Sequence, residues 1–174
     1  MTDRTTTNTA DTVASTIDTP AGPLSVLVND DVVVAAGFTG PDELWDRLAP
    51  NVRRPLTHRS ELGAITRHLA RYLDGQLDAL DDIPVDQPGT QLQHEVWAGL
   101  RAIPAGETRT YSELASMTSR PRAIRATGTA CGRNLIAPMV PCHRALRADG
   151  SLGGYYYGLD VKRWLLSHEA AAEG

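Results

Sequence analysis

A break in composition at residues 78–89 divides this 174-residue chain into two parts with different secondary structure. The segment, DALDDIPVDQPG, holds two prolines, four aspartates and a glycine, which disfavour a continuous helix or a central strand. Short apolar runs typical of strands, together with helical segments, precede it, whereas apolar residues at helical spacing predominate after it. The sequence therefore predicts an N-terminal α/β domain over 13–86 and a second domain over 90–174, joined near 86–90.

Three apolar runs within residues 13–38, separated by turn sequences, predict a small antiparallel meander. A short helix is expected to begin at Pro41, and residues 83–85 could add an edge strand. A longer helix is predicted over 59–73, because apolar residues recur there on one helical face: Leu62, Ile65, Leu69 and Tyr72.

Residues 1–12 are polar and lack an apolar stretch, so we expect a disordered tail and no export signal. No apolar run reaches the roughly 18 residues that a membrane span needs, so no membrane partner is expected. These features predict a cytoplasmic protein, associated with the nucleoid if the source is prokaryotic. The two cysteines, Cys131 and Cys142, lack zinc-site spacing, so no metal is predicted, and Cys131 is interpreted as a packed thiol.

Charge is unevenly distributed along the chain. Residues 1–90 carry 7 Arg or Lys and 14 Asp or Glu, a net charge of −7, whereas residues 91–174 carry 10 and 7, a net charge of +3. Eight arginines lie within 101–147. A locally basic region in an acidic protein indicates a face that binds a polyanion, although a randomly uneven surface would have the same totals.

The second part of the chain predicts four helices. Residues 90–103 have Thr90 as N-cap candidate, and residues 160–169 form the last helix. A short helix over 111–117 and a second over 121–130, with Pro121 in its first turn, form a helix-turn-helix pattern. Arginines on the second helix suit a DNA groove, but an ordinary αα-hairpin with a solvated arginine face has the same pattern.

Reactive side chains gather in the pentapeptide VPCHR, residues 140–144. A thiol beside an imidazole is typical of a cysteine nucleophile with a nearby base, because the thiolate is the reactive form. A buried structural cysteine beside a surface histidine is the alternative interpretation of the isolated pair.

A larger set of residues keeps the order and spacing of one family: Gly106-Glu107-Thr108, Tyr111, Glu113-Leu114-Ala115, Arg125-Ala126, Gly132-Arg133-Asn134, the pentapeptide, Gly150, Leu152-Gly153-Gly154-Tyr155, Gly158, Lys162 and Leu165-Leu166. This pattern resembles the O6-alkylguanine-DNA alkyltransferases, closely over 90–169 and in outline over 13–85. The resemblance implies an α+β fold: a small N-terminal antiparallel sheet with helices, RNase H-like, then a mostly helical domain with a DNA-binding helix-turn-helix.

The resemblance also implies direct-reversal DNA repair. An alkyl group would move irreversibly from O6-alkylguanine to Cys142, once per protein molecule and without a cofactor, as in a methylated-DNA–[protein]-cysteine S-methyltransferase. The resemblance leaves open whether the protein also acts on O4-alkylthymine. By the same resemblance, His143 would be the base acting through a water, Glu169 would complete the relay, Asn134 would brace the loop, and Tyr111 would donate to the departing guanine.

The implied partner is double-stranded DNA, bound in the minor groove with the target nucleotide flipped out. Arg125 would fill the gap in the base stack, while Arg122 and Arg133 would contact phosphates. Small or polar residues of the second helix would approach the groove: Ala123, Ala126 and Thr127. We expect a monomer in solution, and cooperative assembly along DNA stays open.

The substrate pocket would be walled by residues on both sides of the pentapeptide: Met139, Val140, Gly153, Tyr155 and Tyr156. Two positions depart from the family pattern. Leu135 replaces a usual proline in the loop after Asn134, and Tyr156 is bulky where some relatives carry a small residue. A non-catalytic binder of alkylated DNA, a cysteine hydrolase and a helix-turn-helix transcription factor are the alternative functions.

Overall fold

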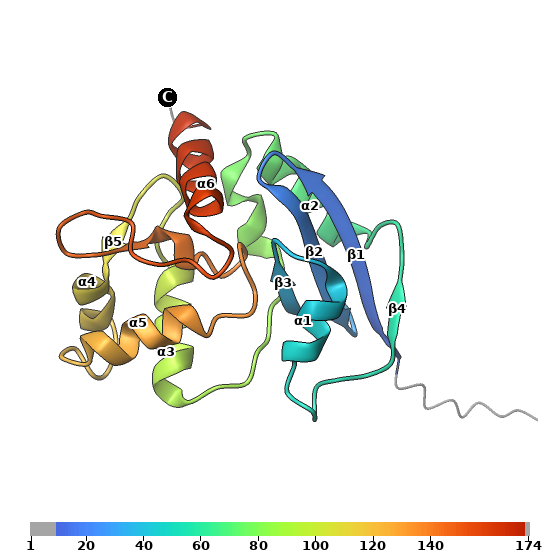
Figure 1. Ribbon diagram of the computed structural model, residues 1–174, viewed down its shortest axis with the longest axis horizontal. Coiled ribbons are helices and arrows are strands. Elements are labelled where there is room, and N and C mark those ends of the chain that lie inside the picture. The colour runs from blue at the N-terminus through green and yellow to red at the C-terminus, as the bar shows by residue number, and fades with distance from the viewer. Residues whose placement is uncertain (1–9, 173–174) are drawn as a thin grey trace, which may run out of the picture.

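The computed structural model describes residues 10–172. The first three strands form the predicted antiparallel meander: β1 (Thr12–Thr19), β2 (Gly22–Asn29) and β3 (Val32–Gly37). A fourth strand, β4 (Leu56–His58), pairs with β1 in parallel, so the order is β3-β2-β1-β4 (Figure 1). The α+β class is confirmed, but the sheet is mixed rather than antiparallel. A three-residue strand has too short a pattern to be recognised in the sequence.

Different helices cover the two faces of this sheet, as Figure 1 shows. Because side chains alternate along a strand, Leu24 and Val26 of β2 face one side and Leu27 the other. The first pair packs in a cluster with residues of α2 (Ala64–Leu73), and Leu27 packs in a second cluster with residues of α1 (Pro41–Arg47).

Two predicted elements of this half need correction. The helix predicted over 59–73 begins at Ala64, because Gly63 adopts a positive φ of 64° and the Leu62 N–H donates to the Thr66 hydroxyl. The edge strand expected at 83–85 is reduced to one bridge between Val33 and Val85. A 3-10 helix, η1 (Leu77–Asp82), occupies the acidic segment before it.

The second half is mostly helical. Its elements are α3 (Gln91–Arg101), β5 (Arg109–Thr110), α4 (Tyr111–Ser116), α5 (Ile124–Gly132), the 3-10 turn η2 (Cys142–Arg144), β6 (Ala145–Leu146) and α6 (Leu159–Ala172). The Thr90 cap is confirmed: its hydroxyl accepts from the Gln93 N–H, and the Gln93 side chain accepts from the Thr90 N–H.

Helix α5 begins three residues later than predicted. Pro121 is not in its first turn, because residues 120–124 form tight turns in which the Ala123 N–H donates to the Arg120 carbonyl and the Ile124 N–H to the Arg122 carbonyl. Arg122 therefore precedes the helix and does not share a helical face with Arg125.

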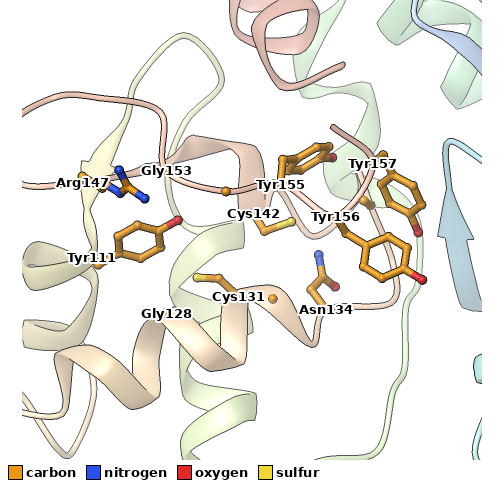
Figure 2. Close-up of a pocket in the computed structure, with 13 residues that line it drawn as sticks. Tyr111, Gly128, Cys131, Asn134, Cys142, Arg147, Gly153, Tyr155, Tyr156 and Tyr157 are labelled. Carbon is orange, nitrogen blue, oxygen red and sulfur yellow. The ribbon is translucent and has the colours of Figure 1, made fainter. Parts of the chain in front are cut away.

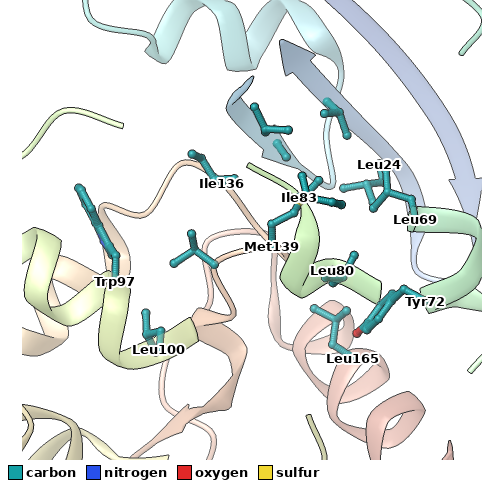
Figure 3. Packing of buried hydrophobic residues seen from close by; sticks show 14 of the residues in the cluster. Leu24, Leu69, Tyr72, Leu80, Ile83, Trp97, Leu100, Ile136, Met139 and Leu165 are labelled. Atoms are coloured by element: carbon teal, nitrogen blue, oxygen red, sulfur yellow. The ribbon is translucent and has the colours of Figure 1, made fainter. Parts of the chain in front are cut away.

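One hydrophobic cluster joins the two halves (Figure 3). It includes Leu24 and Leu69 from the first half and Trp97, Leu100 and Leu165 from the second. The proposed boundary near 86–90 lies in the extended segment between η1 and α3. No helix among residues 10–172 is long and apolar enough to cross a membrane. The predicted tail falls mostly outside the described residues, although Thr12 already begins β1.

Candidate active site

Cys142 opens onto a cavity of about 400 Å³ between α5, η2 and the segment 147–157 (Figure 2). The thiol is a free, half-buried cysteine at the first position of η2. Tyr111, Asn134, Gly153 and Tyr155 line the same cavity, and so does the buried Cys131. The cavity thus brings together residues separated by more than forty positions in the sequence.

Behind Cys142, a buried hydrogen-bonded cluster surrounds Glu169 of α6. His143 Nε2 lies 2.8 Å from Glu169 Oε2, so the predicted approach of these residues is present in the structure. Arg144 donates from Nε to Oε1 at 2.9 Å and from Nη2 to Oε2 at 3.0 Å. Tyr72, from α2, donates its hydroxyl to Oε2 at 2.7 Å. The carboxylate therefore holds one imidazole, one guanidinium and one phenol together.

The electrostatics favour an ionised Glu169 and a neutral His143. Burial opposes ionisation of Glu169, but the hydrogen bonds from His143 and Arg144, together with the Arg144 charge, hold the pKa of this carboxyl well below its usual range. Burial lowers the pKa of His143, and Glu169 opposes this only in part. A neutral imidazole that donates from Nε2 keeps Nδ1 as an acceptor, and that atom has no hydrogen-bond partner among residues 10–172.

The Cys142 thiol is a protonated group that needs a base. Burial raises the pKa of Cys142, and the Asn134 amide and the Lys162 charge act in the opposite direction. The nucleophile must therefore lose its proton as it reacts, which the neighbouring imidazole can accept.

Asn134 hydrogen-bonds to the loop before Cys142 at two points. Its amide donates to the Val140 carbonyl at 2.8 Å, and its Oδ1 accepts from the Ile136 N–H at 3.0 Å. Gln87, in the segment between the two halves, donates to Asn134 Oδ1 and accepts from the Leu135 N–H, each at 2.9 Å. The linker is thus part of the support of the site.

Leu135, which stands where the family pattern has proline, lies in a segment that pairs with the backbone of β3. The Ala36 N–H donates to the Leu135 carbonyl at 2.8 Å, and the Ala137 N–H donates to the Ala36 carbonyl at 3.0 Å. The Leu135 side chain packs in the cluster that contains Leu44 of α1. These contacts hold the loop at Leu135 against the N-terminal half.

Lys162 hydrogen-bonds to backbone on both sides of the cavity. Its side chain is fully buried, and Nζ donates to the carbonyls of Ala145, Leu152 and Gly154. The first carbonyl lies just after η2 and the other two flank Gly153. One buried ammonium therefore fixes the wall of the cavity relative to the segment that carries the thiol.

The segment 155–157 closes the cavity against the N-terminal half. Tyr156 is 55% exposed, with the Arg47 guanidinium 3.8 Å from its ring centroid, and its hydroxyl donates to Glu43 at 3.2 Å. Tyr157 also lines the cavity and accepts from Arg47 Nη1 at 3.2 Å. Burial, opposed by Arg47, raises the pKa of Tyr157 to about 12.

Three predicted residues have other environments. Met139 and Val140 do not line the cavity; both are buried in the main cluster, since the loop turns these apolar side chains toward the shared core. Thr127 is fully buried, and its hydroxyl donates to the Ala123 carbonyl, so it is not a surface group for DNA.

The predicted DNA-binding arginines are exposed: Arg122, Arg125 and Arg133. Ala123 and Ala126 are half-buried beside them. Two of the eight arginines in 101–147 bind partners within the protein instead. Arg144 pairs with Glu169, and Arg101 donates to carbonyls of residues 80–83. The basic surface is therefore smaller than the sequence count indicates.

The sequence interpretation missed three functional neighbours and misjudged a fourth. Tyr72, Gln87 and Tyr157 had no local signal, because their roles depend on contacts with residues between 47 and 110 positions away. Lys162 carries a signal in the sequence, because a lysine on the apolar side of a helix is unusual, although it enters the prediction from sequence only within the family pattern.

Comparison with known proteins agrees with this geometry. The family model described as the DNA binding domain of 6-O-methylguanine DNA methyltransferase matches residues 91–171. The methylated-DNA–protein-cysteine methyltransferase of Salmonella typhimurium is 37% identical over 160 residues, covering 88% of this chain and 92% of the relative. That of Methanosarcina barkeri is 48% identical over 103 residues, covering 59% of this chain and 65% of the relative.

Among solved structures, the crystal structure of Mycobacterium tuberculosis OGT in complex with DNA has a TM-score of 0.77 to this fold, at 34% sequence identity. The match covers 92% of this chain and 94% of that one. Agreement over nearly the whole chain, in sequence and in fold, shows that the protein belongs to the methylated-DNA–protein-cysteine methyltransferase family.

Proposed function

We propose that this protein repairs DNA by direct reversal, moving the alkyl group of O6-alkylguanine in double-stranded DNA to Cys142 once per molecule. The observation that carries the proposal is the half-buried Cys142 thiol at a cavity, with the buried His143–Glu169 pair directly behind it. The named activity of the relatives at 36–48% identity supports the same reaction.

In the proposed reaction, His143 Nδ1 takes the Cys142 proton through a water molecule, while Glu169 stabilises the imidazolium through Nε2. The Cys142 sulfur then forms a bond to the alkyl carbon as the bond between that carbon and guanine O6 breaks. The electron pair of the broken bond returns to the purine, which regains a proton. Cys142 ends as a thioether, which is not a leaving group, so each molecule acts once.

Tyr111 is proposed to donate its hydroxyl to the ring nitrogen that gains charge as the alkyl group leaves. Burial raises the pKa of Tyr111, so the hydroxyl stays protonated and can act as the donor. Asn134 is proposed to hold the loop, and Cys142 with it, in the geometry for attack.

The target atom lies inside the duplex, so the proposed complex has the nucleotide flipped out through the minor groove. Arg125 would occupy the gap in the stack, because a planar cation can both stack and donate hydrogen bonds. Arg122 and Arg133 would contact phosphates. The relative solved with DNA supports DNA as the partner. We propose that the protein binds it as a monomer.

The direct experiment is intact-mass measurement after incubation with a duplex that contains one O6-methylguanine. We expect the protein to gain one methyl group and to stop there at excess duplex. Cys142→Ser should gain none and still bind the duplex. A wild-type protein that gains no methyl group would indicate a non-catalytic binder, and continued turnover would indicate a hydrolase; either result contradicts the proposal.

A further inference from the structure

Tyr72 connects the N-terminal half to the Glu169 carboxylate. Its side chain is 1% exposed, and its hydroxyl donates to Glu169 Oε2 at 2.7 Å across 97 positions of sequence. The residue is fixed at a second point, because its carbonyl lies 2.7 Å from His168 Nε2 and its ring contacts the His168 ring edge-on. These contacts therefore hold Tyr72 in place as a hydrogen-bond donor to Glu169.

We propose that Tyr72 is a positioning residue for the alkyl transfer, which holds the Glu169 carboxylate against His143 and limits how strongly that carboxylate attracts the imidazole proton. The expected effect of Tyr72 on the rate of methyl transfer rests on the proposed function. The effect of Tyr72 on the protonation of His143 can be measured without methyl transfer.

The argument begins with the donors that share one carboxylate oxygen. Oε2 of Glu169 accepts from Tyr72, from His143 and from Arg144 Nη2, at 2.7, 2.8 and 3.0 Å. Each donor draws on the same negative charge. Without the Tyr72 hydroxyl, more of that charge would act on the imidazole, and the protonated form of His143 would be favoured.

The surrounding groups do not replace Tyr72. Arg144 and Lys162 are the cations that act on His143, and both disfavour its protonation. The Tyr155 hydroxyl is close enough to Glu169 and Tyr72 for both to act on its pKa, but it has no hydrogen-bond partner among the described residues. Asp81 faces Arg144 from η1. Burial and the neighbouring carboxylate raise the pKa of Tyr72, so its hydroxyl stays protonated as a donor throughout the working range.

The test is to titrate the His143 imidazole by nitrogen NMR in the full chain labelled with 15N-histidine, in the wild type and in Tyr72→Phe. We expect the His143 titration to move upward by roughly half a pH unit or more in Tyr72→Phe. Methyl transfer needs neutral His143, so the loss of rate as the pH is lowered should begin at a correspondingly higher pH in Tyr72→Phe. An unchanged His143 titration in folded Tyr72→Phe would overturn the proposal.

Leu69→Val is the matched control, because Leu69 lies on the same helix and in the same buried cluster but cannot donate a hydrogen bond. It should lower the melting temperature without moving the His143 titration. An equal shift in Leu69→Val would mean that Tyr72 acts through packing alone, which contradicts the proposal.

Replacing Tyr72 by 3,5-difluorotyrosine keeps the ring and makes the hydroxyl a stronger donor, so it serves even if Tyr72→Phe does not fold. The His143 titration should then move downward, opposite to the effect of removing the hydroxyl, and an upward shift or no shift would overturn the proposal. If wild-type protein gains no methyl group while these shifts occur, the proposed function fails and the role of Tyr72 in setting the His143 proton affinity stands.

Discussion

At the scale of single residues, Glu169 has more partners than the sequence indicates. The pentapeptide predicts a thiol with a base, and only the family resemblance points to Glu169 as their partner. Its contact with His143 depends on how α6 packs, 26 positions away, and no local pattern reports that. Arg144 reads in the sequence as a cation next to the site, yet it is buried and bonded to Glu169 at both carboxylate oxygens.

This pairing predicts a stability loss in Glu169→Gln. The substitution keeps the shape but leaves the Arg144 guanidinium buried without a counter-charge, so the free energy of unfolding at pH 7 should fall by about 3 kcal/mol. Chemical denaturation measures it. Asp160→Asn on the same helix is the control, because the Asp160–Arg163 pair is exposed and its loss should change the stability little.

The buried pair of Glu169 and Arg144 also makes the free energy of unfolding depend on pH in a definite direction. The pKa of Glu169 is lowered on folding, so its contribution is present above the unfolded value near 4.5 and is lost as the pH falls toward the folded value. The stability difference between wild type and Glu169→Gln should therefore narrow below pH 4.5. A difference that is constant with pH would contradict an ionised Glu169 in the folded protein.

At the scale of elements, the sequence predicts features set by neighbouring residues better than features set by contacts between distant segments. The start of α3 could be predicted from Thr90 as N-cap candidate, because the donors and acceptors of a helix cap lie within four residues. The start of α5 was misplaced, because a proline suits both a helical first turn and the turn that precedes it. The strand β4 and the contact of residues 155–157 with β3 depend on tertiary pairing, so the sequence could not indicate them.

Contact between β3 and the cavity wall predicts a defect in Gly37→Ala. A Cβ at Gly37 would lie 1.9 Å from the Tyr157 hydroxyl oxygen and 2.3 Å from its ring carbon Cζ, so the ring must move. We expect a loss of about 1–3 kcal/mol in stability and slower methyl transfer. Gly40→Ala, where a Cβ meets nothing within 4 Å, should match the wild type in both measurements. Equal behaviour of the two variants would show that the wall does not depend on this contact.

At the scale of the whole molecule, the two halves form one functional unit. The composition break at 78–89 lies between the four-stranded sheet and the mostly helical half, but the site draws on both. Gln87 supports the nucleophile loop, Tyr72 supports the carboxylate, and Arg47 supports the cavity wall. A prediction from sequence could locate the reactive residues within the second half, but not their dependence on the first.

The exposed arginines predict salt-dependent binding to duplex DNA. Arg122→Ala removes one proposed phosphate contact, so the slope of log K against log salt concentration should become shallower by about one. Arg163→Ala removes another exposed arginine, one that pairs with Asp160 on α6, and its slope should equal that of the wild type. Fluorescence anisotropy across a salt series measures both, and equal slopes for all three proteins would exclude Arg122 from the interface.

The central claim is that Cys142, and not the Cys131 that shares its cavity, accepts the alkyl group. Cleavage after Arg125, Arg133 and Arg144 places the two cysteines in different peptides, 126–133 and 134–144. The decisive measurement is peptide mass mapping after reaction with duplex that contains O6-methylguanine. One methyl group on Cys142 of the 134–144 peptide is predicted. A methyl group on Cys131, or repair of the lesion with neither peptide modified, would contradict the account.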